Sequence, residues 1–124
     1  MNTTNIAIAK AYYKAMGEKN VEGMSAYLHP DLQVLSPLAT FKEKRVYLES
    51  LKNFLPLFKS MTLRRIFSSE DQIMLAYDLD FPEPLGMFPV AVILTLKGGL
   101  ITTLELFYDA RPFDKKKDSY SVTN

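Results

Sequence analysis

The chain contains no cysteine and no tryptophan, and His29 is its single histidine. Without cysteine there is no disulfide framework and no thiolate metal site, and one histidine excludes a histidine-based metal cluster. We therefore expect neither a metal nor another cofactor. The absence of cysteine also fits a reducing compartment, so the expected location is cytoplasmic.

The chain also lacks an excess of one charge and a long apolar run. Lys and Arg total 15 against 14 for Asp and Glu, which gives a formal net charge of +1. This balance gives no argument for nucleic acid or an anionic membrane as a partner. No apolar stretch approaches the roughly 20 residues of a membrane span. Residues 1–10 lack the pattern of a signal peptide.

The sequence does contain enough apolar residues for one core. Its 124 residues are 48% hydrophobic and 12% aromatic, which suits one domain that needs no disulfides. We place this domain at residues 1–113. The remaining residues, 114–124, are polar and carry the basic run 115–117 between Asp114 and Asp118. They are expected to form a solvated, disordered tail.

Helical periodicity dominates the first part of the chain. Over residues 4–18, apolar side chains recur at spacings of three and four, and Gly17 near the end is a candidate left-handed stop. A short helix is expected over 21–28, because the residue before Pro30 is disfavoured in the helical region. A strand is expected over residues 32–36.

A third helix and a run of strands make up the rest. Thr40 and Glu43 have the spacing of a capping box, so the helix is expected to begin near Phe41, and Pro56 should end or kink it. Antiparallel strands are expected at 61–67, 73–81, 90–96 and 100–108. The second of them alternates with a period of two, and the third is continuously apolar, as for a strand buried on both faces. This order predicts an α+β fold with helices on one face of a curved sheet.

Two pairs of short segments resemble a known family. Residues 20–24 have the sequence NVEGM and residues 27–31 have YLHPD, which is similar to the second helix and first strand of the nuclear transport factor 2-like superfamily. Residues 97–101, KGGLI, and 106–109, LFYD, resemble its last hairpin and final strand. The likeness is strongest to its SnoaL-like and ketosteroid isomerase-like branch. It implies a cone, with three N-terminal helices on a strongly curved, mixed antiparallel sheet and a ligand at the open end.

The resemblance also implies which groups a ketosteroid isomerase would need. Those enzymes combine a tyrosine oxyanion donor on the first helix, a general-base aspartate at the end of the first strand and a protonated aspartate on a late strand. The matching positions here hold Tyr12, Ser36 and a residue near Val92, so two of the three groups are missing. A serine without an adjacent base is not a general base near pH 7. Ketosteroid isomerase chemistry is not expected, and Tyr12 and Ser36 are the only catalytic candidates.

Residues that face the inside of such a cone are expected to line its cavity. The predicted set is Tyr12, Ser36, Tyr47, Phe54, Tyr77, Val92, Leu104 and Tyr108. Core packing is the alternative for this set, with a solvated boundary hydroxyl for Tyr12 and a turn for Ser36. Apolar walls with a few tyrosine hydroxyls suit a small hydrophobic molecule.

The remaining polar candidates are assigned to the surface. His29 is expected in a surface loop outside the cone. Asp78 and Asp80 lie two apart on one strand, so they point the same way, toward a solvated or interface face. Of the adjacent Arg64 and Arg65, alternation allows only one to face inward, and the sequence does not choose between them.

Two functions remain open at this point. One is a SnoaL-like protein that binds a small hydrophobic molecule, with or without cofactor-independent isomerase- or cyclase-like chemistry. The other is a non-catalytic interaction module that forms a homodimer through the outer sheet face, as in the transport factor that names the superfamily. Phe107 and the face bearing Met74 and Ala76 are the candidate contacts, because an exposed apolar sheet face needs cover.

Overall fold

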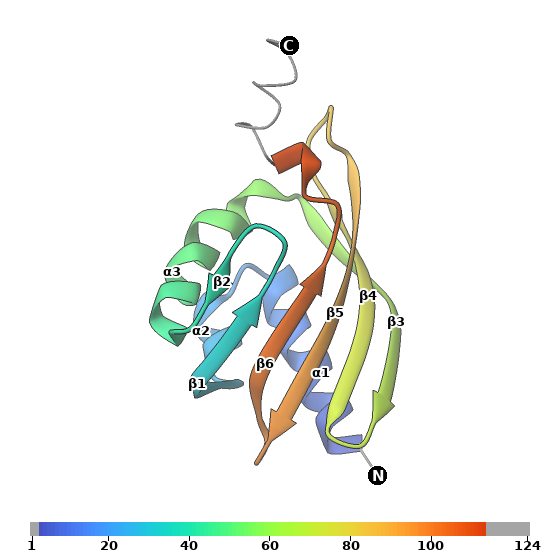
Figure 1. The fold of residues 1–124 in the computed structure, drawn as a ribbon. Helices are drawn as coiled ribbons and strands as arrows, with labels where there is room; N and C mark the ends of the chain where they lie inside the picture. Colours follow the sequence, from blue (N-terminus) through green and yellow to red (C-terminus); the bar gives the residue numbers. More distant parts are fainter. Residues whose placement is uncertain (1–2, 114–124) are drawn as a thin grey trace.

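A curved six-stranded sheet carries three helices on one face in a computed structural model that describes residues 3–113 (Figure 1). The predicted α+β class, with a mixed sheet that wraps the helices and stays open, is confirmed. The tail expected over 114–124 lies outside the described residues. Within residues 3–113, no helix combines the length and the apolar character needed to cross a membrane.

The sheet joins the first strand of the chain to the last. The helices are α1 (Thr3–Gly17), α2 (Val21–Ser25) and α3 (Lys44–Phe54), with short 3-10 turns η1 (Leu55–Leu57) and η2 (Arg111–Phe113). The strands are β1 (Leu28–Leu35), β2 (Thr40–Phe41), β3 (Ser60–Ser69), β4 (Gln72–Asp80), β5 (Met87–Lys97) and β6 (Leu100–Phe107). Their order is β2-β1-β6-β5-β4-β3, and only the β1–β6 pair is parallel.

α3 begins later than predicted because the sheet takes the residues before it. Thr40 and Phe41 pair with β1 as the short strand β2, so Thr40 is not a helix cap. The N-cap residue is Glu43, which has an extended backbone and makes no side-chain capping bond. The prediction that α3 ends at Pro56 is close, since the helix stops at Phe54 and Pro56 lies in η1.

The chain enters the sheet sooner than predicted after α2. His29 and Pro30 lie in β1, so the expectation of a loop at His29 is wrong. His29 Nδ1 accepts a hydrogen bond from the Asp31 amide at 2.9 Å. The register of β1 against β6 is irregular between Leu28 and Gln33. This irregularity accommodates a proline that has no amide proton to donate.

A lysine follows α1 in the left-handed conformation that was predicted for Gly17. Gly17 is the last residue of α1, but Lys19 is the residue with a positive φ, 62°. The Lys19 ammonium donates to the carbonyl oxygens of Leu55 and Phe58, and it lies 4.2 Å from the centroid of the Phe58 ring. These contacts tie the end of α1 to the end of α3.

A β-bulge decides where the two adjacent arginines point. The register of β3 against β4 shifts between Leu63 and Arg65, which makes Arg64 the extra residue. Arg64 and Arg65 are both exposed, so neither faces the inside of the cone. Arg64 Nη1 donates to Asp78 Oδ1 at 3.2 Å on the outer side of the sheet. Strict alternation would have placed one of the two inside.

The side chains of β5 alternate, although burial on both faces was predicted. Val90, Val92 and Leu94 are buried toward the helices, whereas Ala91 and Ile93 are only half-buried. All three helices lie on the inner face, so in the described part of the chain the outer face of the sheet has no helical layer (Figure 1).

Candidate functional site

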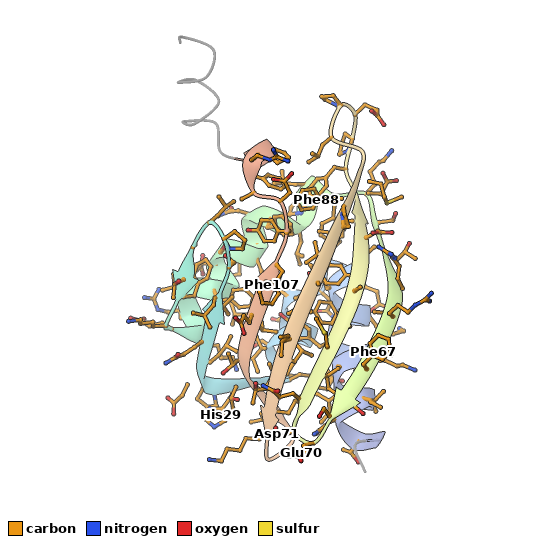
Figure 2. The ribbon with its side chains drawn as sticks, turned by 45° about the vertical axis from the view of Figure 1, so that its right-hand side comes forward. His29, Phe67, Glu70, Asp71, Phe88 and Phe107 are labelled. Carbon is orange, nitrogen blue, oxygen red and sulfur yellow. The ribbon has the colours of Figure 1, made fainter. Side chains whose placement is uncertain are left out.

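A pocket of about 240 Å³ lies between α3, the sheet and the hairpin that joins β1 to β2. Its rim carries Leu38 from the hairpin, Leu57 from η1 and Phe113 from η2. These three segments come together at one end of the sheet, the upper end in Figure 1. Phe88, another lining residue, lies near the same end in Figure 2. The opening is therefore at this end of the sheet.

Five of the eight residues predicted for the cavity line this pocket. They are Ser36, Tyr47, Phe54, Tyr77 and Tyr108. The other three, Tyr12, Val92 and Leu104, are buried in the core and do not line it.

Sequence reasoning missed several lining residues. Tyr13 on α1 was not in the predicted set, and it forms part of the pocket wall. Ser50 was not considered, although it lies three residues after Tyr47 and four before Phe54 on one face of α3. That spacing was a usable signal, because residues three and four apart on a helix are neighbours. Phe88 lies near the start of β5 and Phe113 lies in η2, and neither had such a helical spacing to indicate it.

Tyr12 and Tyr47 are joined by a hydrogen bond between their hydroxyl groups. The two Oη atoms are 2.9 Å apart. Tyr12 is 0% exposed, so the alternative of a solvated boundary hydroxyl is wrong as well. Tyr47 is 9% exposed and lines the pocket, with its ring edge-on to Phe41 at a centroid distance of 5.6 Å. Tyr12 thus reaches the pocket through its neighbours, by the hydrogen bond to Tyr47 and by ring contact with Tyr13 at a centroid distance of 4.8 Å.

Burial keeps the phenols around the pocket neutral. It raises the pKa of Tyr12 and of Tyr13 well above the ordinary value of 10.0. Burial also raises the pKa of Tyr77 above that value, and it raises the pKa of Tyr47 to about 12 although the Tyr12 hydrogen bond acts in the opposite direction. These four groups stay protonated at neutral pH and can donate hydrogen bonds.

Hydroxyl groups supply the side-chain polarity of the pocket. Within residues 3–113, no lining side chain is Asp, Glu, His, Lys or Arg. Four tyrosines and two serines supply the polar atoms. The Ser36 hydroxyl is already used in the turn after β1, since it donates to the Ala39 carbonyl at 2.7 Å and accepts from the Ala39 amide at 3.2 Å. Ser36 is therefore both a turn residue and part of the wall.

The described residues also offer no obvious metal centre. Among residues 3–113, no group of three or more His, Asp or Glu side chains is placed to hold a metal ion. Asp78 and Asp80 lie half-buried on the outer side of the sheet. Asp80 has Lys59 at 4.0 Å as its ion-pair partner there, and Asp78 has Arg64. These carboxylates do not reach the pocket.

Comparison with models of protein families decides which family this chain belongs to. Residues 9–104 match the SnoaL-like domain family. The chain is a SnoaL-like domain. It also shares its fold with solved proteins described as NTF2-like, so the predicted resemblance is confirmed at the level of the fold. A comparison of this SnoaL-like domain with curated proteins finds no match.

Solved structures share the fold over nearly the whole SnoaL-like domain. A protein from Kribbella flavida gives a TM-score of 0.82 at 19% identity, covering 93% of this chain and 94% of that one. TerC, co-crystallised with polyporic acid, gives a TM-score of 0.76 at 19% identity, covering 91% of this chain and 97% of that one. A Catenulispora acidiphila protein with a ketosteroid isomerase-like fold, in complex with trimethylamine, gives a TM-score of 0.70 at 16% identity. The match covers 82% of this chain and 85% of that one. At these identities the likeness shows the fold alone.

Proposed function

We propose that this SnoaL-like domain binds a small, neutral, mainly apolar molecule in the pocket between α3 and the sheet. The observation that carries the proposal is the chemistry of the walls. They are aromatic and aliphatic, their polar side chains are hydroxyls, and in residues 3–113 they include no ionic side chain. Apolar ligand surface gains about 25 cal/mol per Å² on burial there, whereas an ionic ligand finds no side chain of opposite charge.

The size of the pocket further limits which ligands can fit. Its volume of about 240 Å³ is just below the roughly 300–1000 Å³ of sites for drug-sized ligands. A molecule of one or two rings fits this volume better than a four-ring steroid. Two proteins of the same fold hold small molecules, polyporic acid and trimethylamine, which supports small-molecule binding as a use of this fold.

Binding is proposed in preference to isomerase- or cyclase-like turnover. Acid-base catalysis needs a base within hydrogen-bond reach of the substrate. The lining side chains in the described part of the chain include no carboxylate and no imidazole. Burial raises the pKa of Tyr47 and Tyr77, so both remain protonated near pH 7. A protonated phenol can polarise a ligand oxygen, but it does not remove a proton.

Filling the pocket from α3 is expected to block binding. Ser50 lines the pocket, and Asn53 is exposed on the same helix. Ser50→Leu is expected to weaken binding of 2-acetylnaphthalene, a neutral two-ring ketone, by roughly tenfold or more, because the added isobutyl group occupies ligand volume. Asn53→Leu should keep the wild-type affinity. Isothermal titration calorimetry measures both, and equal affinities for Ser50→Leu and wild type would rule out this pocket as the site.

A second candidate, a dimeric interaction module, is favoured by an apolar band on the outer sheet face. Cross-strand pairing brings together six side chains there: Phe67, Met74, Ala76, Ala91, Ile93 and Phe107. Phe67 is 63% exposed, and Met74 and Phe107 are 46% and 45% exposed. Figure 2 shows Phe67 on β3 and Phe107 on β6. Such a band is a natural contact for a second copy of the chain.

A charge placed in this band is expected to separate two copies. For a homodimer closed over the band, Met74→Lys should raise the dimer Kd by roughly 100-fold or more, because the ammonium would be buried without a partner. Val46 is also exposed but lies on α3, so Val46→Lys is the matched control and should leave the dimer intact. Sedimentation velocity measures the mass. A wild-type chain that stays monomeric at high concentration would remove this candidate.

A further inference from the structure

We infer that Tyr12 and Tyr47 form a directed hydroxyl pair that makes Tyr47 a dedicated hydrogen-bond donor into the pocket. The pocket then selects neutral ring compounds that carry an acceptor oxygen, such as aryl ketones. This inference rests on the proposed binding function and names the ligand class of the same site. It follows from a count of protons, from burial and from the way the Tyr47 ring is held.

The two hydroxyls share one hydrogen bond, which leaves one proton to be placed. Their oxygens are 2.9 Å apart, and within residues 3–113 neither hydroxyl has another hydrogen-bond partner. Each phenol carries one proton, and its oxygen can also accept. One proton lies between the two oxygens. The other proton has no acceptor in the described protein.

Burial decides which oxygen keeps the spare proton. Tyr12 is fully enclosed and does not line the pocket, so a spare proton there would be a buried donor without a partner, which is strongly unfavourable. Tyr47 lines the pocket and Tyr12 does not, so we assign the spare proton to Tyr47 and place it toward the pocket, where a ligand or water can accept it. Tyr12 therefore donates to Tyr47, and Tyr47 donates into the pocket.

The electrostatics of the pair agree with this direction. Burial is the largest influence on both groups and raises the pKa of each. The hydrogen bond itself raises the pKa of Tyr12 further, as expected for the donor, whereas it acts to lower the pKa of Tyr47, as expected for the acceptor. Accepting from Tyr12 also polarises the Tyr47 hydroxyl and makes it a stronger donor.

The position of the Tyr47 hydroxyl is fixed before a ligand arrives. Phe41 holds the ring edge-on at a centroid distance of 5.6 Å, and the Tyr12 bond fixes the oxygen. The helices that carry the two tyrosines, α1 and α3, are tied together by Lys19 through the carbonyl of Leu55. A donor that is already oriented loses little conformational freedom on binding, so its bond contributes directly to selectivity.

The test compares two neutral probes of nearly equal shape. 2-Acetylnaphthalene and 2-isopropenylnaphthalene carry C=O and C=CH₂ at the same position, so only the first offers an acceptor. Calorimetry on the wild type is expected to give roughly 3- to 10-fold tighter binding of the ketone, the worth of one hydrogen bond. Equal affinities would overturn this inference and leave the binding function intact. Binding of neither probe would overturn both.

Two single variants test whether the Tyr12–Tyr47 pair causes the preference for the ketone over the alkene. Tyr47→Phe should bring the ratio of the two affinities to about 1 while the alkene affinity stays within about twofold. Tyr12→Phe should roughly halve the ratio, because Tyr47 keeps its proton but loses the polarising partner. A purely structural role would change both affinities together and leave the ratio unmoved.

A double variant keeps the inference testable if Tyr47→Phe alone does not fold. Tyr47→Phe leaves the Tyr12 hydroxyl buried without a partner, whereas Tyr12→Phe/Tyr47→Phe removes both hydroxyls and is expected to fold well. In this double variant the ratio of ketone affinity to alkene affinity is also expected to be about 1. A ratio in the double variant equal to that of the wild type would overturn the inference.

Discussion

Above about pH 10 the protein is expected to begin to unfold, because four of its seven tyrosines are buried as neutral phenols. Burial raises the pKa of Tyr47 to about 12, and it raises the pKa of Tyr12, Tyr13 and Tyr77 above 10.0 as well. In the unfolded chain each phenol ionises near pH 10. The stabilisation from these groups is therefore fully present below the unfolded pKa and is lost as the pH rises through the folded values.

The expected loss is a large fraction of the total stability. For Tyr47 alone, the difference between 10.0 and about 12 corresponds to roughly 2–3 kcal/mol, at about 1.4 kcal/mol per pKa unit. Domains of this kind are typically stable by only about 5–15 kcal/mol. The other three phenols act in the same direction, so the alkaline transition should be cooperative.

Two optical signals measured on one sample check this prediction. For the buried phenols, the absorbance of tyrosinate should rise only at a pH well above 10, together with the loss of far-ultraviolet circular dichroism. The Tyr12→Phe/Tyr47→Phe variant should unfold at a higher pH than the wild type. Titration of all seven tyrosines near pH 10 with an unchanged dichroism spectrum would contradict the assignment.

Phe81→Ala is expected to lower the free energy of unfolding by about 3–5 kcal/mol, the usual range for removing a buried phenylalanine. The Phe81 ring is surrounded by four others, with centroid distances of 6.1 Å to Phe54, 6.3 Å to Phe58, 5.8 Å to Phe88 and 5.7 Å to Phe113. Truncation leaves a cavity that these rings cannot close without losing their own contacts.

Urea denaturation with a matched variant measures this effect. Phe67→Ala removes an identical ring from the exposed outer face and should change stability by no more than about 0.5 kcal/mol. Phe88 and Phe113 also line the pocket, so Phe81→Ala should weaken binding of 2-acetylnaphthalene as well. Equal losses in the two variants would show that the aromatic cluster around Phe81 adds nothing beyond surface packing.

Periodicity in the sequence was sufficient to predict the fold class. The alternation of Ile73, Leu75, Tyr77, Leu79 and Phe81 predicted one inner face, and all five are buried. Such patterns are local, because side-chain direction follows from the backbone period alone. The helical face of α3 through Tyr47 and Phe54 could be predicted for the same reason, and both residues line the pocket.

Local rules failed where a distant group competed for the same backbone. Thr40 has the spacing of a helix cap, but pairing with β1 gives its backbone partners that a cap would not. Gly17 was the natural left-handed residue, but Lys19 takes that conformation, where its ammonium reaches the carbonyls at the end of α3. The bulge at Arg64 likewise depends on how β4 pairs.

The sequence by itself determined an α+β domain with apolar inner faces rich in tyrosine, because those properties follow from composition and period. It did not determine the site. Tyr12 and Tyr47 are 35 positions apart, and only the packing of α1 and α3 inside the curved sheet joins their hydroxyls. The same packing buries Tyr12, leaves Tyr47 at the pocket and lets η2 bring Phe113 to the rim. These contacts depend on how distant segments meet, which no local pattern encodes.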